Sequence, residues 1–412
     1  MPSFQKFMVL ATASVGAFAA SSSDCTTDMT IDSVNPTFDC DTIDAKVTVS
    51  PSLQGNLQIE GPKVFKQDFV ISNTSSLLSI SSSSLQAIGG EFLVEDAGLL
   101  ASVDLQKLTK LNKLTFRRLG QLNKLTFSSS GVSQASSVDI ADTFLSDISG
   151  LNLATVDSLT INNNRRLAKF NSNLVNITKT LILTNNGNDM QVNLTDLQSA
   201  YEIQVSNIKS LDTPALKEIQ NGIKFDTNPN LETYQAANLT NVGTSKNGGS
   251  VSFINNGKLT NISFPYLKTI SGDLTIVNNT NLDEITGFPE LKSVENMLLG
   301  GTFEKYVTLS NSQASSTNNS SAELPKLDDV KGTINVKSTS NLTDVCKFFN
   351  GLKGKVVQGK VNCAGGLDNK TANDQNGLNK TGSSGNGSGA GTPSFSTAAI
   401  FLGLIAGAAQ LL

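Results

Sequence analysis

A short strand motif recurs along most of this chain, and its spacing constrains the fold more than any other feature of the sequence. In each copy two apolar residues flank a third, usually polar, residue, as expected for a strand with one buried face. From Phe69 to Met297 the first positions of successive copies are 20 to 28 residues apart, and most steps are close to 22. The copies are Leu57/Ile59, Phe69/Ile71, Phe92/Val94, Leu114/Phe116, Val138/Ile140, Leu159/Ile161, Leu181/Leu183, Ile203/Val205, Ile223/Phe225, Val251/Phe253, Leu274/Ile276, Met297/Leu299 and Ile334/Val336.

Repeats of this length are typical of solenoids, in which each repeat forms one coil and contacts only its neighbours. We therefore predict an all-β chain, a right-handed β-solenoid of about thirteen coils with repeats of ~22 residues and further short strands in each coil. The two longest steps contain polar insertions, residues 244–249 and 310–321, which we interpret as loops between coils.

Asparagine follows many copies of the motif at a fixed distance. It occupies the second position after the motif in six repeats, and aspartate replaces it at Asp96 and Asp142. Asparagine tolerates the left-handed turn conformation, and its amide bonds neighbouring backbone. We expect these side chains either to stack as a partial hydrogen-bonded ladder or to act as independent turn residues. The six asparagines are Asn73, Asn163, Asn185, Asn207, Asn255 and Asn278.

The two ends of the chain are predicted to be processing signals. Lys6, an apolar run to Ala20 and the sequence Ala17-Phe18-Ala19 are typical of a secretory signal peptide, so residues 1–19 are predicted to be removed. A buried N-terminal helix is the alternative. The polar residues 21–24 argue against it, because they interrupt any continuing helix.

At the C-terminus, residues 398–412 carry no charge but are too few for an ordinary membrane span. The small residues Asn386-Gly387-Ser388 and a polar spacer precede them, as in a signal for a glycosylphosphatidylinositol (GPI) anchor. We predict lipid attachment at Asn386 and removal of residues 387–412. A tail anchor or a hydrophobic peptide docked on the body is the alternative. The predicted domains are then the solenoid, residues 20–363, and a flexible Gly/Asn/Ser-rich tether, residues 364–386.

Four cysteines lie near the ends of the predicted solenoid, and three pairings are possible. Local bridges, Cys25–Cys40 and Cys346–Cys363, cost the least chain entropy and are expected in an oxidising compartment. They would cap both ends of the solenoid, where the core is otherwise exposed. Neither pair has the spacing of a zinc site.

Composition argues against most catalytic and nucleic-acid functions. The chain has no histidine, which excludes Ser-His-Asp and Cys-His catalysis. Its formal net charge is −4, which argues against the basic surface that nucleic-acid binding needs. A glycosidase needs two facing carboxylates, whereas Asp328-Asp329 and Glu95-Asp96 are sequence neighbours that point to opposite faces of a strand. The pairs Arg117-Arg118 and Arg165-Arg166 are interpreted as solvated edges, with a shared basic face as the alternative. We predict no catalytic residues, no metal and no small-molecule cofactor.

Sequons for N-glycosylation are spread along the chain, and a secretory route makes several of them acceptors. Asn73 and Asn278 are weaker candidates because they compete with the ladder. The candidates are Asn73, Asn176, Asn193, Asn238, Asn261, Asn278, Asn318, Asn319, Asn341, Asn369 and Asn379. A twelfth sequon begins at Asn386, the predicted lipid site.

Several features together resemble one known family. They are the runs 162–167 and 181–188, the paired cysteines, the repeated Gly-x-Leu-x-Ile phrase, the signal peptide and the GPI signal. In combination they resemble the fungal GPI-anchored cell-wall-organisation glycoproteins of the extracellular-mutant and sporulation-specific type. That family is similar to the receptor L-domain of insulin- and EGF-type receptors. The short tether departs from relatives that often have a long Ser-rich stalk.

The resemblance implies a non-enzymatic scaffold for cell-wall organisation and integrity, located at the plasma membrane or in the wall. The implied partners are cell-wall glycans, mannoproteins and, through the GPI lipid, the outer leaflet of the plasma membrane. Two alternatives stay open: a role in spore-wall assembly, and a receptor-like module that binds a wall glycan or peptide. Clustered exposed apolar residues on the solenoid would favour the binding module.

Overall fold

The structure is a computed structural model that describes residues 25–244, 246, 248–302, 324–338 and 342–365. The predicted signal peptide, the GPI signal and nearly all of the tether lie outside these residues. So do Asn318, Asn319, Asn341, Asn369, Asn379 and Asn386, and the structure does not test the predictions made for them.

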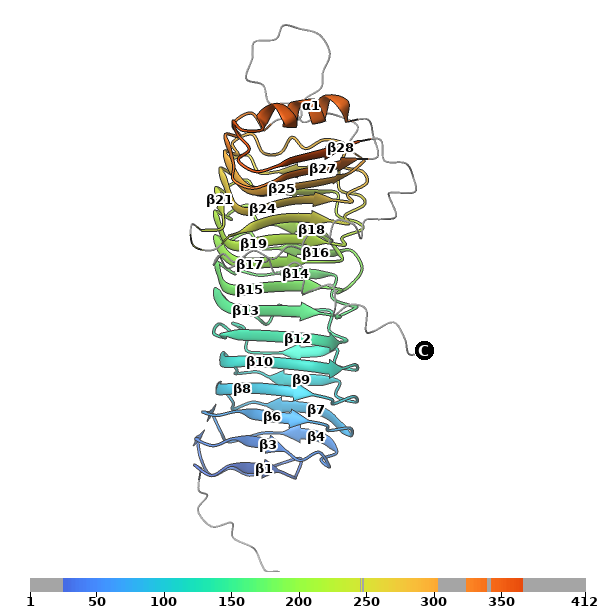
Figure 1. Cartoon of the computed structure of the whole chain (residues 1–412). Helices are drawn as coiled ribbons and strands as arrows, with labels where there is room; N and C mark the ends of the chain where they lie inside the picture. The colour runs from blue at the N-terminus through green and yellow to red at the C-terminus, as the bar shows by residue number, and fades with distance from the viewer. Residues whose placement is uncertain (1–24, 245, 247, 303–323, 339–341, 366–412) are drawn as a thin grey trace, which may run out of the picture. The chain divides into compact units, whose positions relative to one another are not determined.

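The described chain is a β-solenoid, as predicted, with about thirteen turns and almost no helix. Figure 1 shows the long strands stacked in chain order from β1 to β28, and every pair of described strands is parallel. The main sheet contains β1 (Met29–Ile31), β2 (Thr42–Ile43), β3 (Val47–Val49), β5 (Val64–Phe65), β6 (Phe69–Ser72), β8 (Ala87–Glu95), β10 (Lys110–Leu119), β12 (Ser137–Thr143), β13 (Thr155–Asn162), β15 (Asn176–Thr184), β17 (Ser199–Val205), β19 (Glu218–Asp226), β21 (Asn241–Val242), β22 (Ser250–Ile254), β24 (Thr269–Val277), β25 (Ser293–Gly301), β26 (Asp329–Val330), β27 (Ile334–Ser338) and β28 (Val361–Ala364).

Three smaller sheets form a second face of the coils, which confirms that each repeat contains more than one strand. They are built from β4 (Gly55–Gln58), β7 (Leu77–Ser82), β9 (Ser102–Leu105) and β11 (Lys124–Thr126); from β14 (Lys169–Asn171), β16 (Met190–Asn193) and β18 (Ile208–Asp212); and from β20 (Thr233–Gln235) and β23 (Asn261–Ser263).

One of the thirteen predicted motifs lies on the second face instead of in the main sheet. Leu57 belongs to β4 and pairs with Ile80 of β7, whereas the other twelve motifs share one register in the main sheet. Leu57 precedes Phe69 by about half a coil, and alternation alone does not tell which face of a coil a strand occupies. The register instead continues to Val47 and Met29 at one end and to Val361 at the other.

The inward residues of both faces form one continuous apolar core. Aromatic rings stack in it along two stretches. Phe69 lies on Phe92 with ring centroids 5.2 Å apart, and Phe225 lies on Phe253 at 4.6 Å. Because each coil repeats the same inward positions, the phenylalanines meet their counterparts one coil away, and this stacking adds to the burial of apolar surface.

The predicted asparagine positions are turn residues, and the ladder lies one residue further along. Asn163 and Asn255 have φ values of 54° and 58°, and the other predicted positions, with Asp96 and Asp142, are also left-handed. Because a left-handed residue reverses the direction of the chain, the residue after it points into the core. The buried column that results is Thr74, Ala97, Leu119, Thr143, Asn164, Asn186, Ile208, Asn228, Asn256 and Asn279.

The asparagines of this column bond one another and the backbone. Asn228 Nδ2 donates to Asn256 Oδ1 at 2.8 Å, and Asn256 Nδ2 donates to Asn279 Oδ1 at 3.0 Å. The same oxygens accept from the backbone N–H groups of Asn228 and Asn256. Asn164 and Asn186 form an equivalent pair, with an Nδ2–Oδ1 distance of 3.1 Å. The ladder predicted for the six asparagines was therefore wrong in its position: those residues are turn residues, the other alternative, and a ladder exists one residue further along.

The two ends of the solenoid are closed differently. Both predicted disulfides are present, Cys25–Cys40 in the first coil and Cys346–Cys363 in the last. At the C-terminal end α1 (Thr343–Leu352) lies over β28, and its Phe349 is fully buried. At the N-terminal end β1 pairs with β3, and Met29, Val34 and Phe38 of the first coil are half-buried.

Candidate functional site

Three of the four carboxylates considered for catalysis, Glu95, Asp96 and Asp329, are bonded to side chains of neighbouring coils. Arg118 donates to Asp96 from Nε at 2.6 Å and from Nη2 at 2.7 Å, and its Nη2 also contacts Glu95 at 3.1 Å. The hydrogen bonds from Arg118 lower the pKa of Asp96, and those same contacts raise the pKa of Arg118. A glycosidase acid needs a raised pKa, so Asp96 is unsuited to that role.

The second carboxylate pair has a similar structural role. Asp328 is exposed and precedes β26, while Asp329 begins that strand. Gln358 Nε2 donates to Asp329 Oδ1 at 2.7 Å, which links this coil to the last one.

The double arginines do not form the shared basic face that was the alternative interpretation. Arg117 pairs with Asp139 on the following coil, whereas Arg118 reaches back to the preceding one. The guanidinium carbon of Arg166 lies 4.6 Å from the ring centroid of Phe144, a cation–π contact. Arg117, Arg118 and Arg166 therefore link coils, which the sequence did not reveal because the partners are about one repeat away, whereas Arg165 is exposed.

Further charged pairs connect coils along the N-terminal part of the main sheet. Lys113 Nζ lies 2.9 Å from Glu91 Oε1, and Thr115 Oγ1 donates to the same carboxylate. Partial burial acts to raise the pKa of Glu91, but the hydrogen bonds from Thr115 and Lys113 outweigh it, so the pKa is below its usual value. Lys63–Asp41, Lys66–Asp44 and Lys179–Asp157 are similar links.

The six described sequons lie at the surface, but they differ in how their amides are used. Asn73, Asn193, Asn238 and Asn261 are exposed, whereas Asn176 and Asn278 are half-buried. Asn278 Nδ2 donates to Asn255 Oδ1 at 2.7 Å, and Asn238 Nδ2 donates to the carbonyl of Pro214 at 2.7 Å. The contact of Asn278 agrees with its treatment as a weaker candidate, although occupancy at every sequon remains a prediction.

A few large apolar side chains are exposed on the described surface. Leu78, Leu99 and Phe144 lie on coils between β7 and β13, and Tyr266 lies in the turn before β24. Tyr266 is 57% exposed, the highest value among them.

The described residues contain neither a cluster of metal ligands nor a membrane-spanning helix. No group of three or more His, Cys, Asp or Glu side chains in this part of the chain is placed to hold a metal ion. None of the described helices is long and apolar enough to cross a membrane.

The described residues thus define a disulfide-bridged β-solenoid in which several charged and amide side chains link one coil to the next. No protein-family model matches the chain, and no solved structure matches it. Curated relatives do match. A "Cell surface GPI-anchored protein" of Arthroderma benhamiae is 29% identical over 388 residues, which are 92% of each chain. "Protein ecm33" of Aspergillus fumigatus is 27% identical over 81% of this chain and 78% of its own.

A third relative, "Sporulation-specific protein 22" of Saccharomyces cerevisiae, is 25% identical over 77% of this chain and 65% of its own. The first two relatives are matched over most of their length, and their names agree with the resemblance found in the sequence. The comparisons confirm the resemblance: the chain is similar to fungal GPI-anchored cell-surface and cell-wall proteins of the Ecm33 and sporulation-specific type.

Proposed function

We propose that this chain is a glycosylated, GPI-anchored scaffold that supports the organisation and integrity of the fungal cell wall without catalysing a reaction. One observation carries the proposal: Glu95, Asp96 and Asp329, which were considered for catalysis, bond side chains of neighbouring coils instead of facing one another across a site. Arg118 with Glu95 and Asp96 is the clearest case. The proposed partners are wall glycans, mannoproteins and, through the lipid, the outer leaflet of the plasma membrane.

The proposal includes the processing of the chain. Residues 1–19 are removed on secretion, the solenoid occupies residues 20–363, and residues 364–386 form the tether to a lipid on Asn386. Phosphatidylinositol-specific phospholipase C should release the protein from membranes, and mass spectrometry should find no peptide from residues 387–412. Protein that stays in the membrane fraction with that peptide attached would show that the anchor is assigned wrongly.

The absence of catalysis is tested by complementation of a deletion strain. The variants Asp96→Asn, Asp328→Asn and Asp329→Asn should each restore wall integrity as fully as the unmodified chain, because no acid or base is lost. Purified protein should neither cleave nor transfer glucan. A variant that reaches the surface at normal level but fails to complement, together with measurable glucan turnover that it lacks, would contradict the scaffold proposal.

A second candidate, spore-wall assembly, is favoured by the relative named for sporulation. Deletion in vegetative cells and in sporulating cells separates the two roles. A defect confined to spores would favour this candidate, and a vegetative wall defect would favour the first.

A receptor-like binding module has its own supporting observation, the exposed Leu78, Leu99 and Phe144 on the N-terminal coils. Changing Leu78 and Leu99 together to serine tests it. Loss of complementation by this soluble, folded variant would favour a binding role, whereas full complementation would favour the scaffold.

A further inference from the structure

The two ends of the described stack carry charges of opposite sign. Residues 25–46, the first coil, contain Asp28, Asp32, Asp39, Asp41 and Asp44 against a single basic residue, Lys46. Residues 343–365, which form α1 and the last coil, contain Lys347, Lys353, Lys355 and Lys360 against a single acidic residue, Asp344. Because β1 and β28 are the first and last rungs of one sheet, these charges lie at opposite ends of the stack.

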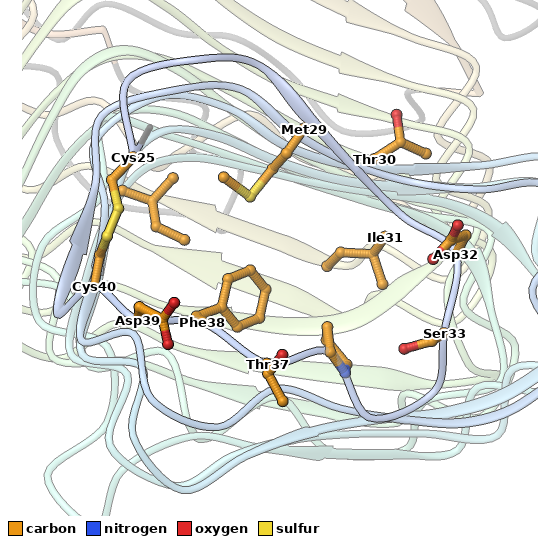
Figure 2. A pocket seen from close by; sticks show the side chains of 12 residues that line it. Cys25, Met29, Thr30, Ile31, Asp32, Ser33, Thr37, Phe38, Asp39 and Cys40 are labelled. Carbon is orange, nitrogen blue, oxygen red and sulfur yellow. A yellow bond between two sulfur atoms is a disulfide. The ribbon is translucent and has the colours of Figure 1, made fainter. Parts of the chain in front are cut away.

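The acidic end offers an apolar centre and free carboxylates. A pocket of about 300 Å³ opens in the first coil, and Figure 2 shows Met29, Ile31 and Phe38 pointing toward its middle. Met29 and Phe38 are only half-buried, unlike the core residues of later coils. Asp32 and Asp39 on its rim are exposed, and no ion pair joins either of them to another described residue.

The basic C-terminal end also combines half-buried apolar side chains with exposed charged residues. Phe348, Leu352 and Val356 are half-buried apolar side chains packed against the end of the core. Lys353 and Lys355 beside them are exposed, and neither forms an ion pair within the described part of the chain. This end therefore also presents apolar side chains with a charged border, but the border has the opposite sign.

We propose that copies of this protein associate head to tail, with the basic C-terminal end of one solenoid on the acidic N-terminal end of the next. Contacts between two acidic or two basic ends are disfavoured by repulsion, which leaves the unlike pair. The apolar centres supply burial, and the charged borders orient the ends. Such a contact joins two different surfaces, so it continues from copy to copy. It would link scaffold molecules to one another, a property beyond the proposed function and independent of it.

Sedimentation velocity tests the contact on the secreted chain truncated after residue 386, which keeps all of the described solenoid residues. Between on the order of 1 and 100 µM, the range of weak and transient interfaces, the average mass should rise with concentration. Raising the salt from about 50 mM to about 500 mM should weaken the association roughly tenfold, because the charges at both borders are exposed.

Charge reversal at each end provides the decisive variants. Asp32→Lys/Asp39→Lys and Lys353→Glu/Lys355→Glu should each sediment as monomers at all concentrations. An equimolar mixture of the two should regain association, with species of at least twice the monomer mass, because it contains one unaltered acidic end and one unaltered basic end. Recovery in the mixture also shows that neither variant is misfolded at its remaining end.

Lys124→Glu/Lys169→Glu serves as a matched control, since it reverses two exposed lysines on the small sheets, away from both ends. It should associate like the unmodified chain. The proposal is overturned if the unmodified chain stays monomeric at the highest concentration, if either end variant still associates, or if the mixture does not.

Discussion

The coils up to β12 and the coils from β13 to β24 differ in the side chains that fill the same buried column and in the contacts that link one coil to the next. In both regions a left-handed residue turns the next side chain into the core. In the earlier coils that position holds Thr74, Ala97 and Leu119, and the links between coils are mostly ion pairs on the outer surface. In the later coils it mostly holds asparagine, and the links run through the buried column.

The difference shows that the solenoid forms with or without an amide ladder in its buried column. An asparagine in the ladder is stable because its neighbours bond both its oxygen and its nitrogen. An apolar residue is equally suitable if its neighbours leave no polar group without a partner. The column therefore depends on agreement between adjacent coils more than on any single residue.

The largest effect is expected when the ladder is cut at its centre. Asn256→Ala removes the acceptor of both Asn228 Nδ2 and the Asn228 N–H in a buried site, and Asn279 Oδ1 keeps only the backbone N–H of residue 256 as a donor. At about 1–3 kcal/mol for each unsatisfied buried group, with some relaxation, the free energy of unfolding should fall by about 4 kcal/mol. Denaturant unfolding measures this fall. A loss below about 1 kcal/mol would mean that the ladder contributes little.

A matched pair of asparagine insertions sharpens the comparison. Ile208 interrupts the ladder, and its backbone N–H already donates to Asn228 Oδ1. Asparagine at this position has amide neighbours on both sides, whereas asparagine at Leu119 has Ala97 and Thr143 beside it. Both changes lose apolar burial, but Leu119→Asn should cost about 2 kcal/mol more than Ile208→Asn, because its amide stays unsatisfied. Equal unfolding midpoints for the two variants would contradict the role given to the neighbours.

Much of this fold could be predicted from the sequence, because a period near 22 and alternation at period two are both visible in it. Twelve motifs lie where the spacing places them. The face occupied by Leu57 and the position of the ladder were not predictable in the same way. The first depends on where the coil bends. The second depends on the left-handed conformation of residues such as Asn163, which points the following side chain inward.

The ion pairs were less predictable, because the partners are about one repeat apart and the sequence shows only single charges. Arg118 with Asp96, 22 residues away, illustrates this. The placement of Asp32 and Asp39 on an open rim was likewise visible only after the first coil had been located.

A smaller effect is expected in the apolar part of the column. Thr74 is fully buried, and its hydroxyl oxygen has no hydrogen-bond partner in the described structure. Thr74→Val keeps the shape and removes the unsatisfied group, so the protein should become more stable by about 1 kcal/mol. Asn73 and Ser75 remain, so the sequon is intact. Thermal unfolding of the protein expressed without glycans measures the change, and a lower melting temperature would show that the hydroxyl has an uncounted partner.

The smallest expected effect is a difference between the two regions in how their stability depends on pH. Hydrogen bonds from Lys66, Arg118 and Thr178 lower the pKa values of Asp44, Asp96 and Asp157, all in the earlier coils or at the start of the later ones. The unfolded chain, with ordinary pKa values of about 3.8, then binds more protons than the folded chain. The stabilisation is therefore fully present above that value and is lost as the pH falls through the lowered pKa values.

Hydrogen exchange followed from about pH 5 to about pH 3 measures this loss, after correction for the intrinsic exchange rates. Amides in β8 and β10 should lose protection first, whereas those in β22 and β24 should change less, because the asparagine amides that link these coils do not titrate. The effect is small, since these ion pairs are exposed and screened by solvent. Arg118→Gln provides the control, because it should reduce the pH dependence in β8 and β10 and leave β22 and β24 as they are. Equal loss of protection in both regions would mean that the surface ion pairs do not distinguish the two kinds of coil.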